Sequence, residues 1–306
     1  MAKKSSSKKT SKKTPPRGAG RTSAHRPPGS VKPTRTARSA NRRRVPFFQV
    51  DAFTSRLYHG NPAGVVVLEK FLPDDVMQAI SAENNLAETA FIVPSGPSSG
   101  PRWKIRWFTP VLEMDLCGHA TLASAHVLWN HLKIRGTKVT FQSASGPLGV
   151  ERQGDIIVLD FPSRPAGKVP ITDMICVALG RPPVELYKAR DYLAVFDNKR
   201  DVHELRPDFH AMERLDAHVI ATAPAAGHDF VSRFFAPTAG VTEDPVTGSS
   251  HCTLIPFWAE RLRKNTLTAH QVSPRGGELF CELRGKRVAI GGHAVTYLEG
   301  MIAVPG

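Results

Sequence analysis

Apolar and polar positions along this chain mostly follow the short alternating or continuous runs that are typical of strands. These runs predict strands at residues 47–53, 65–68, 88–93, 103–108, 139–141, 156–160, 192–196, 217–222 and 230–235, and near residues 270, 280, 288 and 295. Helices are predicted at residues 73–82, 119–132, 173–179 and 249 to about 264. Because strands far outnumber helices and most links are of hairpin length, we expect an α+β fold.

The order of segments occurs twice. Each copy has a Phe-x-Pro turn, a glycine directly before a helix and a tryptophan near the end of that helix, namely Phe108, Gly118 and Trp129, then Phe235, Gly248 and Trp258. A second block repeats too, since residues 146–154 and 277–285 share Gly, Leu, Glu and Gly in register at an offset of 131. Coincidence among common residue types is the alternative.

A repeat of this length predicts two similar lobes rather than a solenoid. We expect two pseudo-symmetric, mainly antiparallel β half-barrels, each around a central helix. The N-terminal lobe is placed at residues 46–165 and the C-terminal lobe at residues 166–306. Ligand sites often lie where two such bodies meet, so the junction between the lobes is the expected site.

Charge divides the chain differently. Residues 1–45 hold fifteen Lys and Arg and no acidic residue, whereas the rest holds 26 basic and 27 acidic side chains. With almost no large apolar residue, this basic tail is expected to be disordered. The composition favours a solvated tail without a partner. Non-specific contact with nucleic acid through phosphate charge and a nuclear-type signal are alternatives, whereas the absence of amphipathic periodicity argues against a transit peptide.

The remaining composition favours a cytoplasmic protein that makes no membrane contact. No run of about 18 apolar residues and no secretory segment occurs. The four cysteines form no Cys-x-x-Cys pair, so we expect reduced thiols rather than a disulfide or zinc framework.

The starts of the two central helices are candidate binding groups. A helix N-terminus presents unpaired N–H groups and a partial positive charge, so two facing starts at Gly118 and Gly248 are suited to a carboxylate or an enolate-like oxygen. For each glycine alone a tight turn is the better explanation, but two glycines in matched contexts favour a binding site.

His119 and Ser249 occupy equivalent first-turn positions. Ser249 is also an ordinary helix cap, whereas His119 is a poor cap and a candidate for proton transfer.

Two acids are candidates for acid–base chemistry. Glu88 stands between apolar residues, where burial raises the pKa of a carboxyl group unless a partner offsets it, and a raised pKa suits a general acid/base. The alternative is a Glu at a strand edge that faces water. Asp244 directly precedes the second helix, where it is placed to orient a histidine or polarise a substrate hydroxyl; the alternative is an Asp-Pro turn.

Five motifs occur in order: Asn61-Pro-Ala-Gly64, Asn85-Leu-Ala-Glu-Thr-Ala-Phe91, Cys117-Gly-His-Ala-Thr121, Ser145-Gly146 and Glu243-Asp-Pro-Val-Thr-Gly-Ser249. Together they resemble the phenazine-biosynthesis PhzF-like isomerase family, which is related in fold to diaminopimelate epimerase. The resemblance covers about residues 46–300 and implies two lobes with the active site between them, and no cofactor or metal. In the best-known member, a glutamate shuttles a proton within dihydro-hydroxyanthranilate, a cyclic dienol acid.

Carried over by motif, the shuttling glutamate is Glu88. The resemblance implies that His119, Asp244 and Ser249 surround the substrate and that Gly118 lends a backbone N–H. The function expected is a cofactor-independent isomerase that moves a proton within a small carboxylate-bearing substrate. Family members often dimerise, so a homodimer is one partner hypothesis.

Two alternatives to the isomerase remain. The first is an amino-acid epimerase that uses Cys117. Related epimerases use two thiols, one at each helix start, but Thr247 stands before the second glycine here. The second alternative is a catalytically inactive binding protein whose basic tail, residues 1–45, contacts nucleic acid.

Overall fold

The computed structural model describes residues 42–96 and 102–305, and these belong to one compact unit. The first strand begins at Arg42, so the predicted tail was drawn too long. Residues 42–45 pair with the last strand through backbone hydrogen bonds. The fold therefore begins before the first apolar residues from which its start was predicted. The rest of the predicted tail, residues 1–41, lies outside the described residues. None of the helices in the described ranges is long and apolar enough to cross a membrane.

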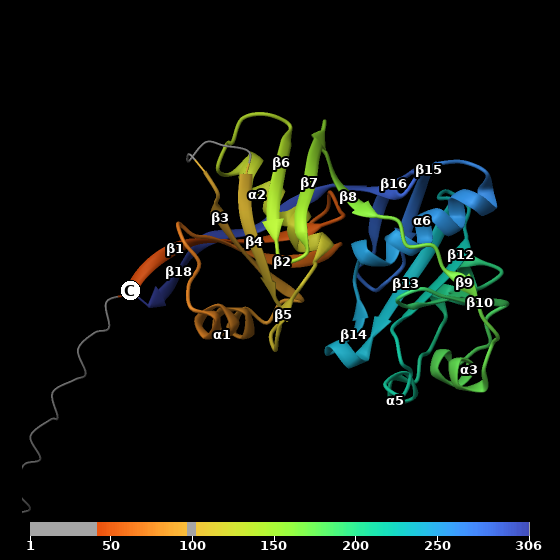
Figure 1. The fold of residues 1–306 in the computed structure, drawn as a ribbon. Coiled ribbons are helices and arrows are strands. Elements are labelled where there is room, and N and C mark those ends of the chain that lie inside the picture. Colours follow the sequence, from red (N-terminus) through yellow and green to blue (C-terminus); the bar gives the residue numbers. More distant parts are fainter. Residues whose placement is uncertain (1–41, 97–101, 306) are drawn as a thin grey trace, which may run out of the picture. The chain divides into compact units, whose positions relative to one another are not determined.

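The first lobe has helices on a curled sheet (Figure 1). Its strands are β1 (Arg42–Ala52), β2 (Asn61–Val67), β3 (Glu88–Pro94), β4 (Arg102–Phe108), β5 (Glu113–Met114), β6 (Lys138–Ser143), β7 (Gly146–Gln153) and β8 (Ile156–Pro162). Its helices are α1 (Asp74–Asn84) and α2 (Gly118–Asn130). All of α2 from Gly118 to Trp129 is buried, which explains why this helix contains no Lys, Arg, Asp or Glu.

The second lobe repeats this plan. Its strands are β9 (Gly167–Lys168), β10 (Glu185–Lys188), β11 (Tyr192–Val195), β12 (Val219–Pro224), β13 (Phe230–Ala236), β14 (Val241–Asp244), β15 (Thr266–Gln271), β16 (Gly277–Arg284) and β17 (Arg287–Gly292). Its helices are α3 (Asp173–Leu179), α4 (Lys199–His203), α5 (Phe209–Met212), the short 3-10 helix η1 (Pro237–Ala239) and α6 (Gly248–Leu262), and β18 (Ala294–Pro305) follows.

Strand pairing confirms the predicted pseudo-symmetry. The parallel pairs β2–β3 and β4–β6 of the first lobe correspond to β11–β12 and β13–β15 of the second. The other thirteen pairings among the described residues are antiparallel, so the fold is mainly antiparallel as expected. Each central helix, α2 or α6, follows the equivalent strands and supplies buried residues to the main core.

The last strand of the chain returns to the first lobe, and this corrects the predicted boundary between the lobes. After β8 the chain enters the second lobe, where β9 pairs with β10; after β17 it returns, and β18 pairs along the whole of β1. In Figure 1, β18 (dark blue) lies beside β1 (orange-red). Residues 294–305 were assigned to the second lobe by position along the chain, but their hydrogen bonds place them in the first. Antiparallel pairing of β8 with β17 joins the lobes directly.

Phe53 of the first lobe packs against the second lobe and forms a hydrogen bond with it. Its side chain is completely buried, and its backbone lies in the left-handed region at φ 62°. The Phe53 carbonyl accepts a hydrogen bond from the backbone N–H of Glu278 at 3.0 Å. A Cβ atom at Gly292 would lie 2.4 Å from the Phe53 ring, so only glycine fits beside this ring without a shift.

We therefore expect Gly292→Ala to lower the free energy of unfolding by about 1–3 kcal/mol, because overpacking forces a buried ring and its backbone to move. Chemical denaturation measures the change. Gly149→Ala in β7 is the control, since a Cβ atom there meets no heavy atom within 4 Å. Equal losses of stability in the two variants would contradict the assigned packing of Phe53.

Candidate active site

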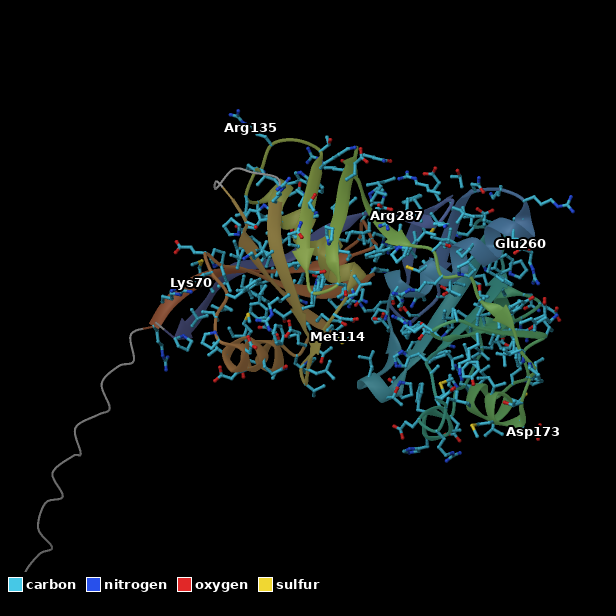
Figure 2. The ribbon with its side chains drawn as sticks, in the orientation of Figure 1. Lys70, Met114, Arg135, Asp173, Glu260 and Arg287 are labelled. Carbon is cyan, nitrogen blue, oxygen red and sulfur yellow. The ribbon has the colours of Figure 1, made fainter. Side chains whose placement is uncertain are left out.

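A cavity of about 550 Å³ lies at the junction of the two lobes. This volume falls within the usual range for a small-molecule site. Residues lining it include Glu88, Gly118 and His119 from the first lobe and Asp244, Gly248 and Ser249 from the second. Apolar side chains complete the wall, among them that of Met114 on β5 (Figure 2). The structure thus brings all six sequence-predicted residues to one cavity, while their roles stay predictions.

The two helix starts touch through their glycines. A Cβ atom at Gly118 would lie 3.4 Å from the Gly248 Cα atom, and one at Gly248 would lie 3.5 Å from the Gly118 Cα atom. The residues before the helices, Cys117 and Thr247, are extended, and neither helix start is capped by a side chain. Ser249 is therefore not the helix cap. Two partial positive charges meet at this cavity, which favours an anion.

Glu88 is paired with His119 and is not an isolated carboxylate. It begins β3, and its Oε2 atom lies 3.1 Å from His119 Nε2, with the two side chains 15% and 5% exposed. Burial acts to lower the pKa of His119, but Cys117 and Glu88 outweigh it and raise that pKa well above 6.5. Burial, together with the charge of Glu88, raises the pKa of the Cys117 thiol.

Asp244 is tied to the first lobe by Asn61, a residue for which the sequence suggested no role. The Asn61 side chain is fully buried, and its Nδ2 atom lies 2.7 Å from Asp244 Oδ1, 2.9 Å from the Val246 carbonyl and 3.2 Å from His119 Nδ1. Burial raises the pKa of Asp244 to about 6, although His119 opposes this shift. Asn61 therefore couples the acid of the second lobe to the acid–base pair of the first.

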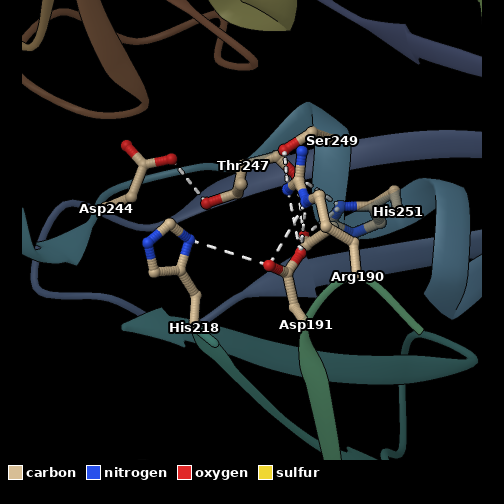
Figure 3. Close-up of polar contacts among 8 residues, drawn as sticks. Arg190, Asp191, His218, Asp244, Thr247, Ser249 and His251 are labelled. Atoms are coloured by element: carbon tan, nitrogen blue, oxygen red, sulfur yellow. Dashed lines mark hydrogen bonds and ion pairs between the residues drawn. The ribbon is translucent and has the colours of Figure 1, made fainter. Parts of the chain in front are cut away.

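Gln271 on β15 fixes the loop that carries Asp244. Its Oε1 atom accepts a hydrogen bond from the Thr247 backbone N–H at 2.9 Å, and its Nε2 atom donates to the Asp244 carbonyl at 2.7 Å. The Thr247 hydroxyl in turn donates to Asp244 Oδ2 at 2.5 Å (Figure 3). Gln271 is fully buried, and no spacing in the sequence pointed to it.

The second lobe adds a further polar group that sequence reasoning missed. Asp191 is buried and accepts hydrogen bonds from Arg190 Nε and Nη2 at 3.1 and 2.8 Å (Figure 3). Its Oδ1 atom lies 3.7 Å from His218 Nδ1. Arg190 Nη2 also donates to Ser249 Oγ at 3.3 Å, which links this group to the start of α6.

Glu88, Cys117 and His119 also carry atoms that could bind a metal ion. Within residues 42–96 and 102–305 they form the one such cluster, with their ligand atoms within 4.8 Å of one another. However, His119 faces Glu88 through Nε2 and Cys117 through Nδ1. One ion can contact only one of these two nitrogens, which leave the ring in different directions, so the contacts suit acid–base chemistry better than a shared metal.

The raised pKa of Asp244 has a consequence for stability. Since the folded protein holds this proton more tightly than the unfolded chain does, the contribution of Asp244 to the free energy of unfolding should fall as pH rises from about 4 to 6. Asp244→Asn removes this titration. As pH rises through that range, the free energy of unfolding of the variant should therefore increase relative to that of the parent by up to about 1.4 kcal/mol per pH unit. His119 contributes at higher pH. Because its pKa is raised well above 6.5, the stability that its protonated form provides is lost only as pH rises above 6.5.

Urea denaturation at several pH values between 4 and 7 measures this difference. Asp74→Asn is the matched control, because Arg106 lowers the pKa of this exposed acid and the sign is reversed. A difference between Asp244→Asn and the parent that is constant over this pH range would show that the Asp244 carboxyl is not buried as described.

Comparison with known proteins agrees with the geometry. The family described as "Phenazine biosynthesis-like protein" matches residues 50–300, which include every residue discussed for the cavity. An uncharacterized isomerase of Pseudomonas aeruginosa is 52% identical over 258 residues, covering 84% of this chain and 97% of that protein. A crystal structure of a PhzF-family protein from Enterococcus faecalis is 46% identical with a TM-score of 0.82, covering 85% of this chain and 99% of that one.

A hydroxyproline epimerase from Agrobacterium vitis shares only the fold, at 12% identity and a TM-score of 0.57, covering 86% of this chain and 94% of that one. The α+β architecture of two pseudo-symmetric half-barrels is therefore that of the diaminopimelate epimerase-like proteins. With a family match over most of its length, the chain belongs to the phenazine biosynthesis-like (PhzF) family of isomerase-related proteins.

Proposed function

We propose that this protein is a cofactor-independent isomerase that moves a proton within a small carboxylate-bearing substrate. The observation that carries the proposal is the pairing of Glu88 with His119 at a cavity where two uncapped helix starts converge. A carboxylate paired with a protonated imidazole supplies a proton acceptor beside a cation. The helix starts supply the partial positive charge that a substrate anion requires.

The reaction begins when Glu88 takes a proton from a carbon atom of the substrate. The electrons of the broken C–H bond move into the substrate, where they give an enolate-like charge. The imidazolium of His119 and the backbone N–H groups at Gly118 and Gly248 stabilise that charge as it develops. Glu88 then returns the same proton to a different atom, and no atom is gained or lost overall. Because the Glu88 side chain is mostly buried, the proton is shielded from exchange with water.

Asp244 acts in this scheme as a hydrogen-bond acceptor for a substrate hydroxyl or ammonium group. Its pKa of about 6 leaves it ionised at neutral pH. Asn61 and the Thr247 hydroxyl donate to its oxygens and hold the carboxylate in place. Positioning of this kind contributes to the rate by fixing the substrate close to its reactive geometry.

An epimerase that uses Cys117 is the second candidate, and one contact favours it. The Cys117 Sγ atom lies 3.6 Å from His119 Nδ1, close enough for a thiol–imidazole interaction. Against it, Cys117 and Thr247 precede α2 and α6 at equivalent positions, so a second thiol is missing where a two-thiol mechanism places it. The raised pKa of Cys117 also disfavours the thiolate that this chemistry uses.

Glu88→Gln should lower turnover by about 10²- to 10⁴-fold, the usual contribution of a general acid/base, because the amide cannot take up the proton. The assay incubates the protein in deuterated water with a panel of small cyclic and unsaturated carboxylic acids and follows isomerisation by NMR. Because the transferred proton is shielded from water, the product should contain little deuterium. Thermal unfolding should show that the near-isosteric variant folds normally.

Two controls complete this experiment. Glu282→Gln changes an exposed acid paired with Arg284 and should retain activity. Cys117→Ser should retain most activity under the proton-shuttle mechanism, whereas loss of activity in that variant would favour the epimerase. If Glu88→Gln is as active as the parent on an acid that the parent isomerises, the proposed mechanism is wrong.

A further inference from the structure

Arg190 lies on the cavity wall, yet it belongs to neither copy of the repeated motif. It stands in the connection between β10 and β11, 59 residues before Ser249 in the sequence. Figure 3 shows its guanidinium group beside Ser249 at the start of α6. The mechanism proposed above assigns Arg190 no role. Among the described residues that line this cavity, however, it is the one Lys or Arg.

The guanidinium group is held in a fixed orientation. Asp191, with a side chain 5% exposed, accepts hydrogen bonds from Arg190 Nε and Nη2, and Ser249 Oγ accepts one from Nη2. Arg190 Nη1 has no hydrogen-bond partner among the described residues, and the side chain is 47% exposed. Holding one edge of a planar guanidinium group leaves the remaining N–H groups preoriented for a ligand.

The remaining donors suit a carboxylate. Arg190 Nη1, the Ser249 hydroxyl and the uncapped backbone N–H groups at the start of α6 come together on the second-lobe side of the cavity. Asp216, the neighbouring acid in the wall, is already paired with Lys188 and with the Tyr192 hydroxyl. A planar carboxylate matches the geometry of a guanidinium group better than a neutral amide does, because its hydrogen bonds are charge-assisted.

We propose that Arg190, assisted by Ser249, is the specificity-determining residue that binds the substrate carboxylate on the second-lobe side. This placement rests on the proposed function, because it directs the reacting C–H bond toward Glu88 of the first lobe. The cavity wall also includes the apolar side chains of Met114, Leu116 and Phe234. The substrate class is therefore a compact acid with an apolar ring or unsaturated body between the carboxylate and the reacting carbon.

Calorimetric titration of the full chain with benzoate and with its neutral counterpart benzamide tests this assignment. The parent should bind benzoate at least about 10-fold more tightly than benzamide, and Arg190→Gln should weaken benzoate binding by about 10- to 100-fold, as expected for loss of a charged hydrogen-bond donor. Binding of benzamide should not change. Arg190→Lys, which keeps the charge but loses the planar fork, should recover part of the loss.

Two further variants serve as controls. Arg287, labelled in Figure 2, is paired with Asp160 and is not among the residues that line the cavity, so Arg287→Gln should bind benzoate like the parent. Ser249→Ala should weaken benzoate binding less than Arg190→Gln, and it tests the site independently if the arginine variant fails to fold. A parent that does not prefer benzoate to benzamide, or a folded Arg190→Gln variant with parental affinity, would overturn the assignment.

The same titrations separate this inference from the proposed function. Turnover by Glu88→Gln reports on the proton shuttle, because Glu88 serves the chemical step, whereas benzoate binding by Arg190→Gln reports on the carboxylate site. If Arg190→Gln loses benzoate binding while Glu88→Gln still turns over substrate, the carboxylate site stands and the proton shuttle fails. The opposite pair of results retains the proton shuttle and removes Arg190 from substrate recognition.

Discussion

The contact between the starts of α2 and α6 is the constraint on which the active site depends. Bringing two partially positive helix ends together is electrostatically unfavourable, and at Gly118 and Gly248 it leaves no space for long side chains. The burial of both helices in one apolar core offsets this cost. Glu88 and Asp244 add negative charge at the same cavity, so the site balances its charges with acids that also serve the proposed reaction.

Asn61 connects Asp244 of the second lobe with the Glu88–His119 pair of the first. One side-chain amide on β2 of the first lobe reaches Asp244, the Val246 carbonyl and the edge of the His119 ring. A shift between the lobes would therefore break hydrogen bonds at the acid and disturb the histidine together. Hydrogen bonds thus join the lobes at the acids themselves, and the Phe53 ring, packed against Gly292, adds an apolar contact between them.

Sequence reasoning found the parts of the site that lie in repeated or ordered motifs. Gly118 and Gly248 stood in matched contexts before apolar segments, and Glu88, His119 and Asp244 lay in motifs whose order resembled one family. Asn61 opens the first of those motifs, but its contact with Asp244 spans 183 residues, and no periodicity records such a contact. Gln271 and Arg190 were missed for the same reason, because each acts through tertiary contacts with the loop before α6 or with its first turn.

The return of β18 to the first lobe also has a consequence for synthesis. The ribosome makes β1 before any part of the second lobe and β18 after β17, so β1 has an unpaired edge throughout that interval. Unpaired strand edges invite association with other chains, and pairing across such a separation is slow because a long loop must close first. The nascent first lobe is therefore a natural client for chaperones until β18 emerges.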